Sequence, residues 1–256
     1  MISFIVVAIK GGVGKTTVTV ELGKAYRRLG LQVGVLDLDY RNPECPLFLN
    51  CIDGKPGRTE TDMVVPVMVD GIHLFSMAFI WPTAKAVLVE DNDARSDIKQ
   101  ILSPGVIAWP FLDVLVADSP PTSAGVTSAA LEPGHFTGAI LLSHPSTASR
   151  DALLRTLDLF SEKQVPVYAL LSNQGCDEEG RPRYDLLDAD IEALAKKYKL
   201  PLFMSIPHTR NLAPHFDRLA ADLLQTKPVI LDPPKEPEGA GWERLVQISK
   251  TLLKPR

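Results

Sequence analysis

The sequence predicts a single α/β domain in three layers, with a mostly parallel central sheet between two layers of helices. Short apolar runs rich in β-branched residues alternate with longer helical patterns, which is typical of βα units. The chain has 256 residues, 45% of them hydrophobic, which is enough for one large core. The first apolar run, residues 2–9, leads through a glycine-rich turn directly into a helical pattern.

Seven apolar runs have the length and composition of buried strands, namely residues 3–8, 32–37, 72–76, 114–118, 138–143, 167–171 and 202–205. Helical patterns cover residues 15–29, 96–102, 149–162, 186–198, 211–224 and 243–253. Gly30 supplies a stop for the first helix. Residues 50–70 are rich in Gly, Pro and Asp and lack periodicity, so we expect a mobile connection there.

The run from Lys10 to Thr17, Lys-Gly-Gly-Val-Gly-Lys-Thr-Thr, follows the first predicted strand and opens the first predicted helix. In this context it predicts a phosphate-binding loop for a nucleoside triphosphate. Glycines allow backbone N–H groups to converge on a polyphosphate, and the helix N-terminus adds its dipole. The predicted nucleotide-binding residues of this loop are Gly11, Gly12, Val13, Gly14, Lys15, Thr16 and Thr17. In this loop Lys15 is expected over the β- and γ-phosphates, and the Thr16 hydroxyl is expected to coordinate Mg²⁺.

Two further segments place carboxylates at the ends of predicted strands. Asp118 ends a buried strand and is followed by Ser-Pro-Pro, the pattern of a Walker B aspartate that holds Mg²⁺. Asp37 and Asp39 end the second strand, so they should face the same edge of the sheet. Capping of the following turn is the alternative for both.

The lysine that opens the loop makes it a deviant Walker A motif, and the chain resembles the MinD/ParA/Mrp group of P-loop ATPases. Leu-Phe-Ser-Met-Ala-Phe at 74–79 and Asp-Ser-Pro-Pro at 118–121 are similar to segments of the Mrp/Nbp-type branch. The resemblance runs from the first residues to about Pro207. It implies the P-loop NTPase fold, and it favours ATP over GTP because no Asn-Lys-x-Asp pattern is present.

The same resemblance implies roles for individual residues. Lys10 would reach the partner's nucleotide across an ATP-dependent homodimer, and Asp39 would orient the attacking water, so Lys10, Lys15 and Asp39 are the predicted catalytic residues. Asp37 would lie near Mg²⁺, which makes Thr16, Asp37 and Asp118 the predicted metal site. Asn173 and Pro207 match positions that contact adenine. Lys10 as a solvent-facing lysine and Asn173 as a turn residue remain alternatives.

The chain departs from the Mrp/Nbp-type pattern in its cysteines. Members that carry iron–sulfur clusters have a Cys-x-x-Cys pair after the sixth strand, whereas this chain has Cys176 alone. A symmetric dimer would then offer two thiolates where a cluster generally takes four. The resemblance therefore predicts ATP and Mg²⁺ as cofactors and leaves a bound iron–sulfur cluster without its usual ligands. A loop thiol with no chemical role is the alternative for Cys176.

Composition limits the remaining classes of function. A net charge of −4 gives no global signal for nucleic-acid binding. Three scattered cysteines fit a reducing compartment, and no segment has the roughly 20 apolar residues of a membrane span, so we expect a cytoplasmic protein.

Residues 1–231 should form the ATPase domain, and residues 232–256 a linker and a C-terminal helix. That helix is amphipathic, and packing on the body is favoured over membrane binding because its positive charges are few.

Two functions follow from these observations. The favoured one is an Mg-ATP-dependent, dimerising ATPase of the Mrp-like branch that assists maturation or the assembly of iron–sulfur-type metal cofactors on an unidentified client. The alternative is a positioning or regulatory switch of the MinD/ParA type, which controls binding to membrane, DNA or a protein partner. Both share the fold and the hydrolytic chemistry, so the phosphate-binding loop cannot distinguish them. A scaffold without turnover would not need Lys15, Thr16, Asp39 and Asp118 together.

Overall fold

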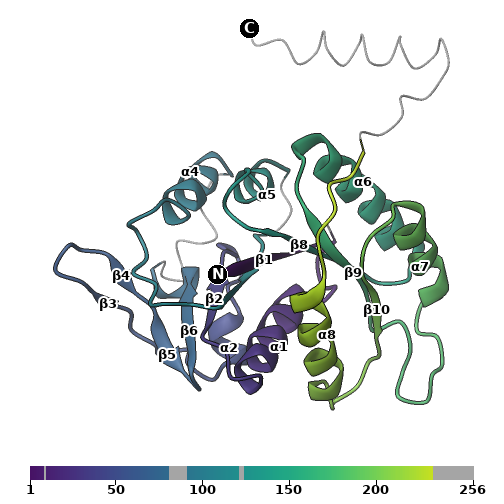
Figure 1. Cartoon of the computed structure of the whole chain (residues 1–256), viewed down its shortest axis with the longest axis horizontal. Helices are drawn as coiled ribbons and strands as arrows, with labels where there is room; N and C mark the ends of the chain where they lie inside the picture. Colours follow the sequence, from purple (N-terminus) through teal and green to yellow (C-terminus); the bar gives the residue numbers. More distant parts are fainter. Residues whose placement is uncertain (9, 81–90, 121–123, 233–256) are drawn as a thin grey trace, which may run out of the picture.

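The computed structural model describes residues 1–8, 10–80, 91–120 and 124–232, and it contains a mostly parallel sheet between two layers of helices (Figure 1). The strands of this sheet are β1 (Ile2–Val7), β2 (Val33–Asp37), β5 (Val67–Val69), β6 (Ile72–Ser76), β7 (Val114–Asp118), β8 (Gly138–Ser143), β9 (Val167–Asn173) and β10 (Phe203–Ile206). The helices are α1 (Lys15–Arg28), α2 (Cys45–Phe48), α4 (Asp91–Ile101), α5 (Ala124–Ala130), α6 (Thr147–Lys163), α7 (Asp188–Lys197) and α8 (Ala213–Gln225). The predicted fold class is confirmed.

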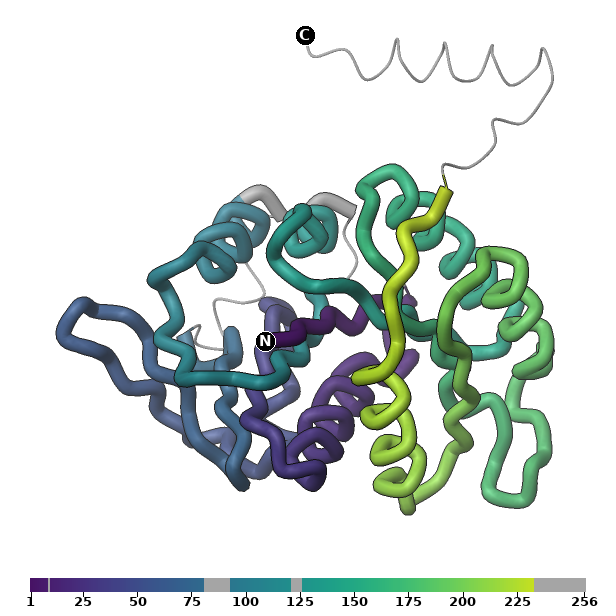
Figure 2. Tube along the Cα trace, viewed as in Figure 1, coloured from purple at the N-terminus to yellow at the C-terminus, as the bar shows by residue number. Residues whose placement is uncertain are grey.

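Strand β1 occupies the middle of the sheet, whose order is β10-β9-β8-β1-β7-β2-β6-β5. It pairs in parallel with β7 on one side and β8 on the other, and Figure 2 shows this first segment running through the centre of the molecule. All neighbours in the sheet are parallel except β5 and β6. The carboxyl ends of β1, β2 and β7 therefore lie side by side at one edge.

Alternate residues of β1 enter two separate hydrophobic clusters, because side chains of a strand alternate between the faces of its sheet. Ile5 and Val7 belong to the cluster that also contains residues of α4, α5, α6 and α7. Phe4 and Val6 belong to the other cluster, with residues of α1 and α8. Figure 1 shows α4, α5 and α6 on one side of the sheet and α1 and α8 on the other. Both faces of the sheet are buried, which explains why its strands read as continuous apolar runs.

The predicted strands all occur, with bounds within two residues of those observed. The first helix ends at Arg28, and Gly30 follows with a φ of 82°, as the predicted stop requires. The prediction for residues 50–70 was wrong. That segment holds β3 (Gly57–Arg58) paired with β4 (Val64–Val65), and it also includes β5, which extends the main sheet as an antiparallel edge strand. These strands have two or three residues each, too few to show a periodicity.

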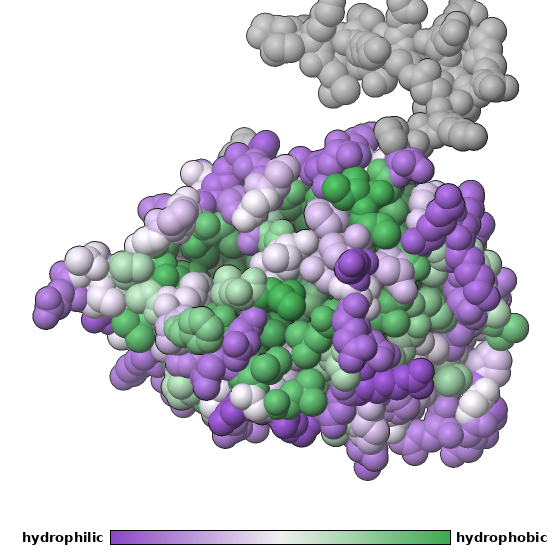
Figure 3. Space-filling view, in the orientation of Figure 1, coloured by the Kyte–Doolittle hydropathy of each residue, from purple (hydrophilic) through white to green (hydrophobic). Residues whose placement is uncertain are grey.

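Helices α2 and α5 were also missed, since they are short and lack a helical repeat of apolar residues. The predicted helix over 243–253 lies outside the described residues, as does the linker before it. Within the described ranges, no helix combines the length and apolar character needed to cross a bilayer. Figure 3 shows the molecular surface in the orientation of Figure 1. Hydrophobic residues gather near the middle of this face, and hydrophilic residues surround them.

Candidate functional site

The loop from Lys10 to Gly14 connects β1 to α1 at the edge where the central strands end. Gly12 and Gly14 have φ values of 76° and 92°, a left-handed conformation that glycine adopts without steric cost. Gly14 is the N-cap residue of α1 and no side chain caps this helix end. The free N–H groups of the first turn are thus available to an anion, as predicted for a phosphate-binding loop.

Asn173 supports this loop from the end of β9. Its Nδ2 donates a hydrogen bond of 2.8 Å to the carbonyl oxygen of Val13, and the side chain is buried. A Cβ on Gly14 would lie only 2.6 Å from that nitrogen. The amide group of Asn173 is therefore used to brace the loop, and its predicted contact with adenine stays a prediction.

Asp118 and Thr16 meet beneath the loop. The Thr16 hydroxyl donates to Asp118 Oδ2 over 2.6 Å. The other oxygen, Oδ1, is buried and has no hydrogen-bond partner. Burial raises the pKa of Asp118 to about 7, although the Thr16 hydrogen bond and the nearby Lys15 ammonium act in the opposite direction. A buried carboxylate oxygen without a partner suits a bound cation.

Asp37 lies beside Asp118, since the two aspartates are partners in the register of β2 and β7. It accepts hydrogen bonds from Ser76 Oγ at 2.9 Å, from the backbone N–H of Asp39 at 3.1 Å and from the backbone N–H of Cys45 at 3.2 Å. Burial and the charge of Asp118 raise its pKa well above the usual range. Two crowded carboxyl groups in a buried site would be stabilised as anions by a divalent cation.

The predicted metal residues are thus brought together, and the structure adds Cys45 to them. Within the described residues, one set of His, Cys, Asp or Glu side chains has ligand atoms close enough to share an ion, all within 4.8 Å of one another. Its members are Asp37, Cys45 and Asp118. Sequence reasoning missed Cys45 because it compared cysteines only with each other, and the partners of this one are aspartates.

Asp39 is half-buried directly after β2. Its Oδ1 accepts the backbone N–H groups of Arg41 and Asn42, each at 2.9 Å, so the carboxylate caps the following turn, the alternative weighed for it. Its charge also reaches Asp118, where it raises the pKa. The capping hydrogen bonds leave Oδ2 for other partners, and the role of Asp39 with water stays a prediction.

Lys10 is exposed at the start of the loop, close to His144 and Asp185. His144 follows β8 and stacks on Tyr184, with ring centroids 4.7 Å apart and planes 24° from parallel. Burial, followed by the charges of Lys10 and Arg183, lowers the pKa of His144 to about 4, so the ring is neutral at physiological pH. The histidines are dispersed along the sequence, and only the fold places His144 near Lys10.

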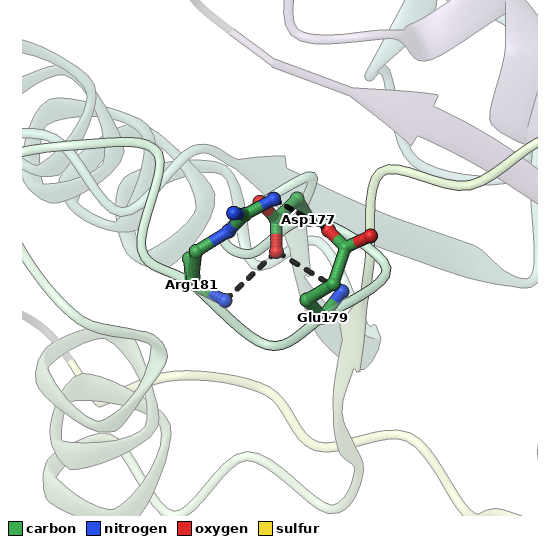
Figure 4. Close-up of polar contacts among 3 residues, drawn as sticks. All are labelled: Asp177, Glu179 and Arg181. Atoms are coloured by element: carbon green, nitrogen blue, oxygen red, sulfur yellow. Dashed lines mark hydrogen bonds and ion pairs between the residues drawn. The ribbon is translucent and has the colours of Figure 1, made fainter.

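Cys176 lies near the start of the irregular segment between β9 and α7. It is half-buried, and burial together with Asp188 and Asp177 raises the pKa of its thiol. All three cysteines of the chain are free. Figure 4 shows the turn that follows Cys176, where Arg181 forms ion pairs of 2.7 Å with both Asp177 and Glu179. The structure thus gives Cys176 an ion-paired turn as its neighbour and brings no second cysteine to it.

Pro207 follows β10 next to this segment. The backbone N–H of Gln174 donates to the Ile206 carbonyl at 2.6 Å, and the N–H of His208 donates to the Cys176 carbonyl at 2.8 Å. These bonds hold together the segments after β9 and β10. The predicted purine loop is thus positioned by the same segment that carries Cys176, while its contact with adenine stays a prediction.

The sequence from residue 2 to 233 matches the family described as ParA, NUBPL iron-transfer P-loop NTPase. Among curated proteins it is similar to the iron–sulfur cluster carrier protein of Haemophilus influenzae, with 27% identity over 248 residues that cover 95% of this chain and 64% of the relative. The protein of the same name from Rickettsia conorii is 28% identical over 209 residues, covering 82% and 62%. The chain therefore spans less than two thirds of the length of these relatives.

Solved structures give the same picture of the fold. A nucleotide-binding protein of Archaeoglobus fulgidus in complex with ADP has a TM-score of 0.64 and 27% identity, covering 86% of this chain and 87% of that one. MinD of Pyrococcus horikoshii, complexed with Mg-ADP, has a TM-score of 0.56 and 18% identity, covering 99% and 96%. The second likeness concerns the fold alone.

Proposed function

Because this chain belongs to the ParA family of P-loop NTPases, in the branch described as NUBPL iron-transfer P-loop NTPase, we propose that it hydrolyses ATP in the service of iron–sulfur cofactor assembly. The observation that carries the proposal is the group formed by the glycine-rich loop, Thr16 and the aspartates Asp37 and Asp118. Curated relatives named iron–sulfur cluster carrier proteins support the biological role.

Phosphate binding follows from the loop and its helix. The uncapped N–H groups at the start of α1 and the Lys15 ammonium would bind the β- and γ-phosphates. Thr16, Asp118 and Asp37 fit Mg²⁺, which would neutralise charge on the β- and γ-phosphate oxygens when bound. The Asn173 hydrogen bond to the Val13 carbonyl would hold the loop in place during binding.

Hydrolysis would then need a positioned water and additional positive charge. Asp39, at the same edge of the sheet, would orient the water for in-line attack on the γ-phosphorus, which breaks the bond to the β–γ bridging oxygen and yields ADP and phosphate. Lys10 would be supplied by each subunit to the nucleotide of the other in a homodimer. Its exposure in the single chain is consistent with such a role, because an exposed side chain is free to cross an interface.

The proposed role in cofactor assembly differs from that of a carrier that holds a whole iron–sulfur cluster with its own cysteines. One Cys176 per subunit gives a symmetric dimer two thiolates, and iron–sulfur clusters generally take four. We therefore propose that the dimer acts on a client that completes the ligand set. Anaerobic purification followed by iron and sulfide analysis tests this: iron should be low in the protein alone, should rise with a client present, and should fall in Cys176→Ser.

The ATPase proposal is tested by phosphate release and light scattering after size exclusion, in Mg-ATP and in Mg-ADP. We expect Lys15→Ala to lose nucleotide binding. Lys10→Ala should bind ATP normally but lose hydrolysis and ATP-induced dimerisation. Lys196 is an exposed lysine of α7 that pairs with Glu192, and Lys196→Ala is the matched control that should behave as the wild type. An unchanged hydrolysis rate in Lys10→Ala would contradict the proposal that Lys10 acts on the nucleotide of the other subunit.

The single Cys176 also favours a second candidate, a regulatory switch of the MinD/ParA type whose dimer exposes a surface to membrane, DNA or protein. Sedimentation of the full chain with anionic liposomes or with DNA, in ATP and in ADP, separates the two. ATP-dependent sedimentation without iron in any preparation would favour the switch, and the reverse result would favour cofactor assembly.

A further inference from the structure

Cys45 lies beside the proposed Mg²⁺ site, although Mg²⁺ does not need a sulfur ligand. It is the first residue of α2 and is fully buried, and its backbone N–H binds Asp37 Oδ2. Its sulfur belongs to the group whose ligand atoms all lie within 4.8 Å of one another, with one oxygen each from Asp37 and Asp118. A buried cysteine is usually surrounded by apolar atoms, whereas this one faces two carboxyl groups.

Asp118 gives an independent reason to expect a ligand here. Thr16 occupies its Oδ2, while Oδ1 is buried without any hydrogen-bond partner. Only 1% of the residue is exposed, so bulk water does not compensate. A buried oxygen without a partner is destabilising, and a bound cation would remove that cost.

We propose that Asp37, Cys45 and Asp118 form a binding site for a thiophilic divalent cation, of which Zn²⁺ is the type, in the nucleotide-free protein. Zn²⁺ binds thiolate and carboxylate ligands at about 2.0–2.3 Å in tetrahedral geometry, so two ligand atoms of one ion lie roughly 3.3–3.8 Å apart. The ligand atoms of the three residues lie within 4.8 Å of one another, so side-chain movements of up to about 1.5 Å would bring them to the separation that a tetrahedral ion needs. Magnesium, in contrast, takes oxygen ligands and gains nothing from Cys45.

The chemistry balances without any other reactant. The Cys45 thiol loses its proton to solvent as the sulfur–metal bond forms, and an aspartate that is protonated in the free site releases its proton to solvent as well, so both bind as carboxylates. The resulting three negative charges face two positive charges of the ion and the ammonium of Lys15, which is near Asp118. A fourth ligand is available from water or from the Thr16 hydroxyl, which already contacts Asp118.

The site shares Asp37 and Asp118 with the proposed Mg²⁺ site, so the thiophilic cation and Mg-ATP should exclude each other. This part of the inference rests on the proposed nucleotide site, whereas the metal site itself needs neither ATP nor hydrolysis. The protein would then exist either loaded with the cation or loaded with nucleotide.

Co²⁺ provides the test, because a cobalt–thiolate bond absorbs light by charge transfer and a cobalt–oxygen site does not. We would titrate the nucleotide-free full chain with Co²⁺ without oxygen and then displace it with Zn²⁺. The band should appear at one equivalent in the wild type and persist in Cys51→Ser and Cys176→Ser, the matched controls. It should vanish in Cys45→Ser.

A wild type without the band, or a band that survives in Cys45→Ser, would overturn the proposal. Asp118→Asn keeps all three cysteines and should weaken Co²⁺ binding at least tenfold, so it tests the site even if Cys45→Ser fails to fold. Unchanged affinity in Asp118→Asn counts against the site as well.

Addition of Mg-ATP tests the competition separately. The cobalt band should fall in the wild type and persist in Lys15→Ala, in which nucleotide does not bind. A band that is unaffected while ATP binding is measured by calorimetry would overturn the shared use of the aspartates. A wild type that gives the sulfur band but never hydrolyses ATP would contradict the proposed function and leave the metal site standing.

Discussion

Gly14 carries two constraints at once: a φ of 92° and a neighbour, Asn173 Nδ2, that would lie 2.6 Å from an added Cβ. We expect Gly14→Ala to lower the free energy of unfolding of the nucleotide-free protein by roughly 1–3 kcal/mol. It should also weaken nucleotide binding, because the Asn173 bond to Val13 must shift. Gly11→Ala is the control, since nothing lies within 4 Å of its Cβ and its φ is not left-handed. Urea unfolding of both variants checks this, and equal losses would contradict it.

Asp118 makes stability depend on pH. Its pKa is about 7 in the folded protein and about 3.9 unfolded, so the folded state binds the proton more tightly. This stabilisation is complete below about pH 4 and is lost as pH rises through 7. Between pH 5 and 8 the wild type without Mg²⁺ should therefore lose roughly 2–4 kcal/mol more than Asp118→Asn. Denaturant unfolding at both pH values measures the difference, and parallel losses would refute the assignment.

At the residue scale, the sequence predicted the site residues that belong to a short contiguous motif or end an apolar strand. The glycines, Lys15 and Thr16 follow from a contiguous motif, and Asp118 from a strand that ends in a carboxylate. Cys45, Ser76 and His144 were not assigned to the site: Cys45 was compared only with the other cysteines, while Ser76 and His144 are brought near Asp37 and Lys10 by the fold. Ser76 donates to Asp37 only because β6 lies beside β2. Nothing in the spacing of these residues along the chain reveals that contact.

At the element scale, α8 shows how burial along one helix determines stability. Leu219 is fully buried in the cluster that α8 shares with α1, whereas Leu224 in the same helix is 36% exposed. We expect Leu219→Ala to reduce the free energy of unfolding by about 2–5 kcal/mol, and Leu224→Ala by less than about 1 kcal/mol. Thermal and urea unfolding measure both. A similar cost for the two variants would mean that α8 does not pack as described.

The elements themselves were predictable where burial imposes a pattern. The fully buried strands read as apolar runs, and α1, α6, α7 and α8 are long enough for their repeats to be recognised. Strands β3, β4 and β5 were missed because their residues are half-buried or exposed and their runs are short. Their pairing depends on neighbours brought in by the fold, such as the bonds of Val64 to Val106 and Ala108.

At the scale of the whole molecule, the segment after α8 closes the domain. Val229 exchanges two backbone hydrogen bonds with Val167, at 2.8 and 2.9 Å, Leu231 is buried, and Ser161 Oγ donates to the Asp232 carbonyl at 2.6 Å. We expect a chain that ends at Asp232 to keep the stability of the described domain. A chain that ends at Thr226 should lose roughly 2–5 kcal/mol. Calorimetric melting of both truncations tests the predicted boundary near residue 231, and equal melting temperatures would place the boundary earlier.

The central position of β1 has a consequence for biosynthesis. Its partners are β7 and β8, and Ile2 already pairs with Val114, so the strand that leads into the phosphate-binding loop has no neighbour until much of the chain has left the ribosome. Contacts so distant in sequence form slowly, and the waiting strand is entirely apolar from Phe4 to Val7. Until those partners are synthesised the apolar strand stays unpaired, and chaperones that hold unfolded polypeptides would have a binding site there.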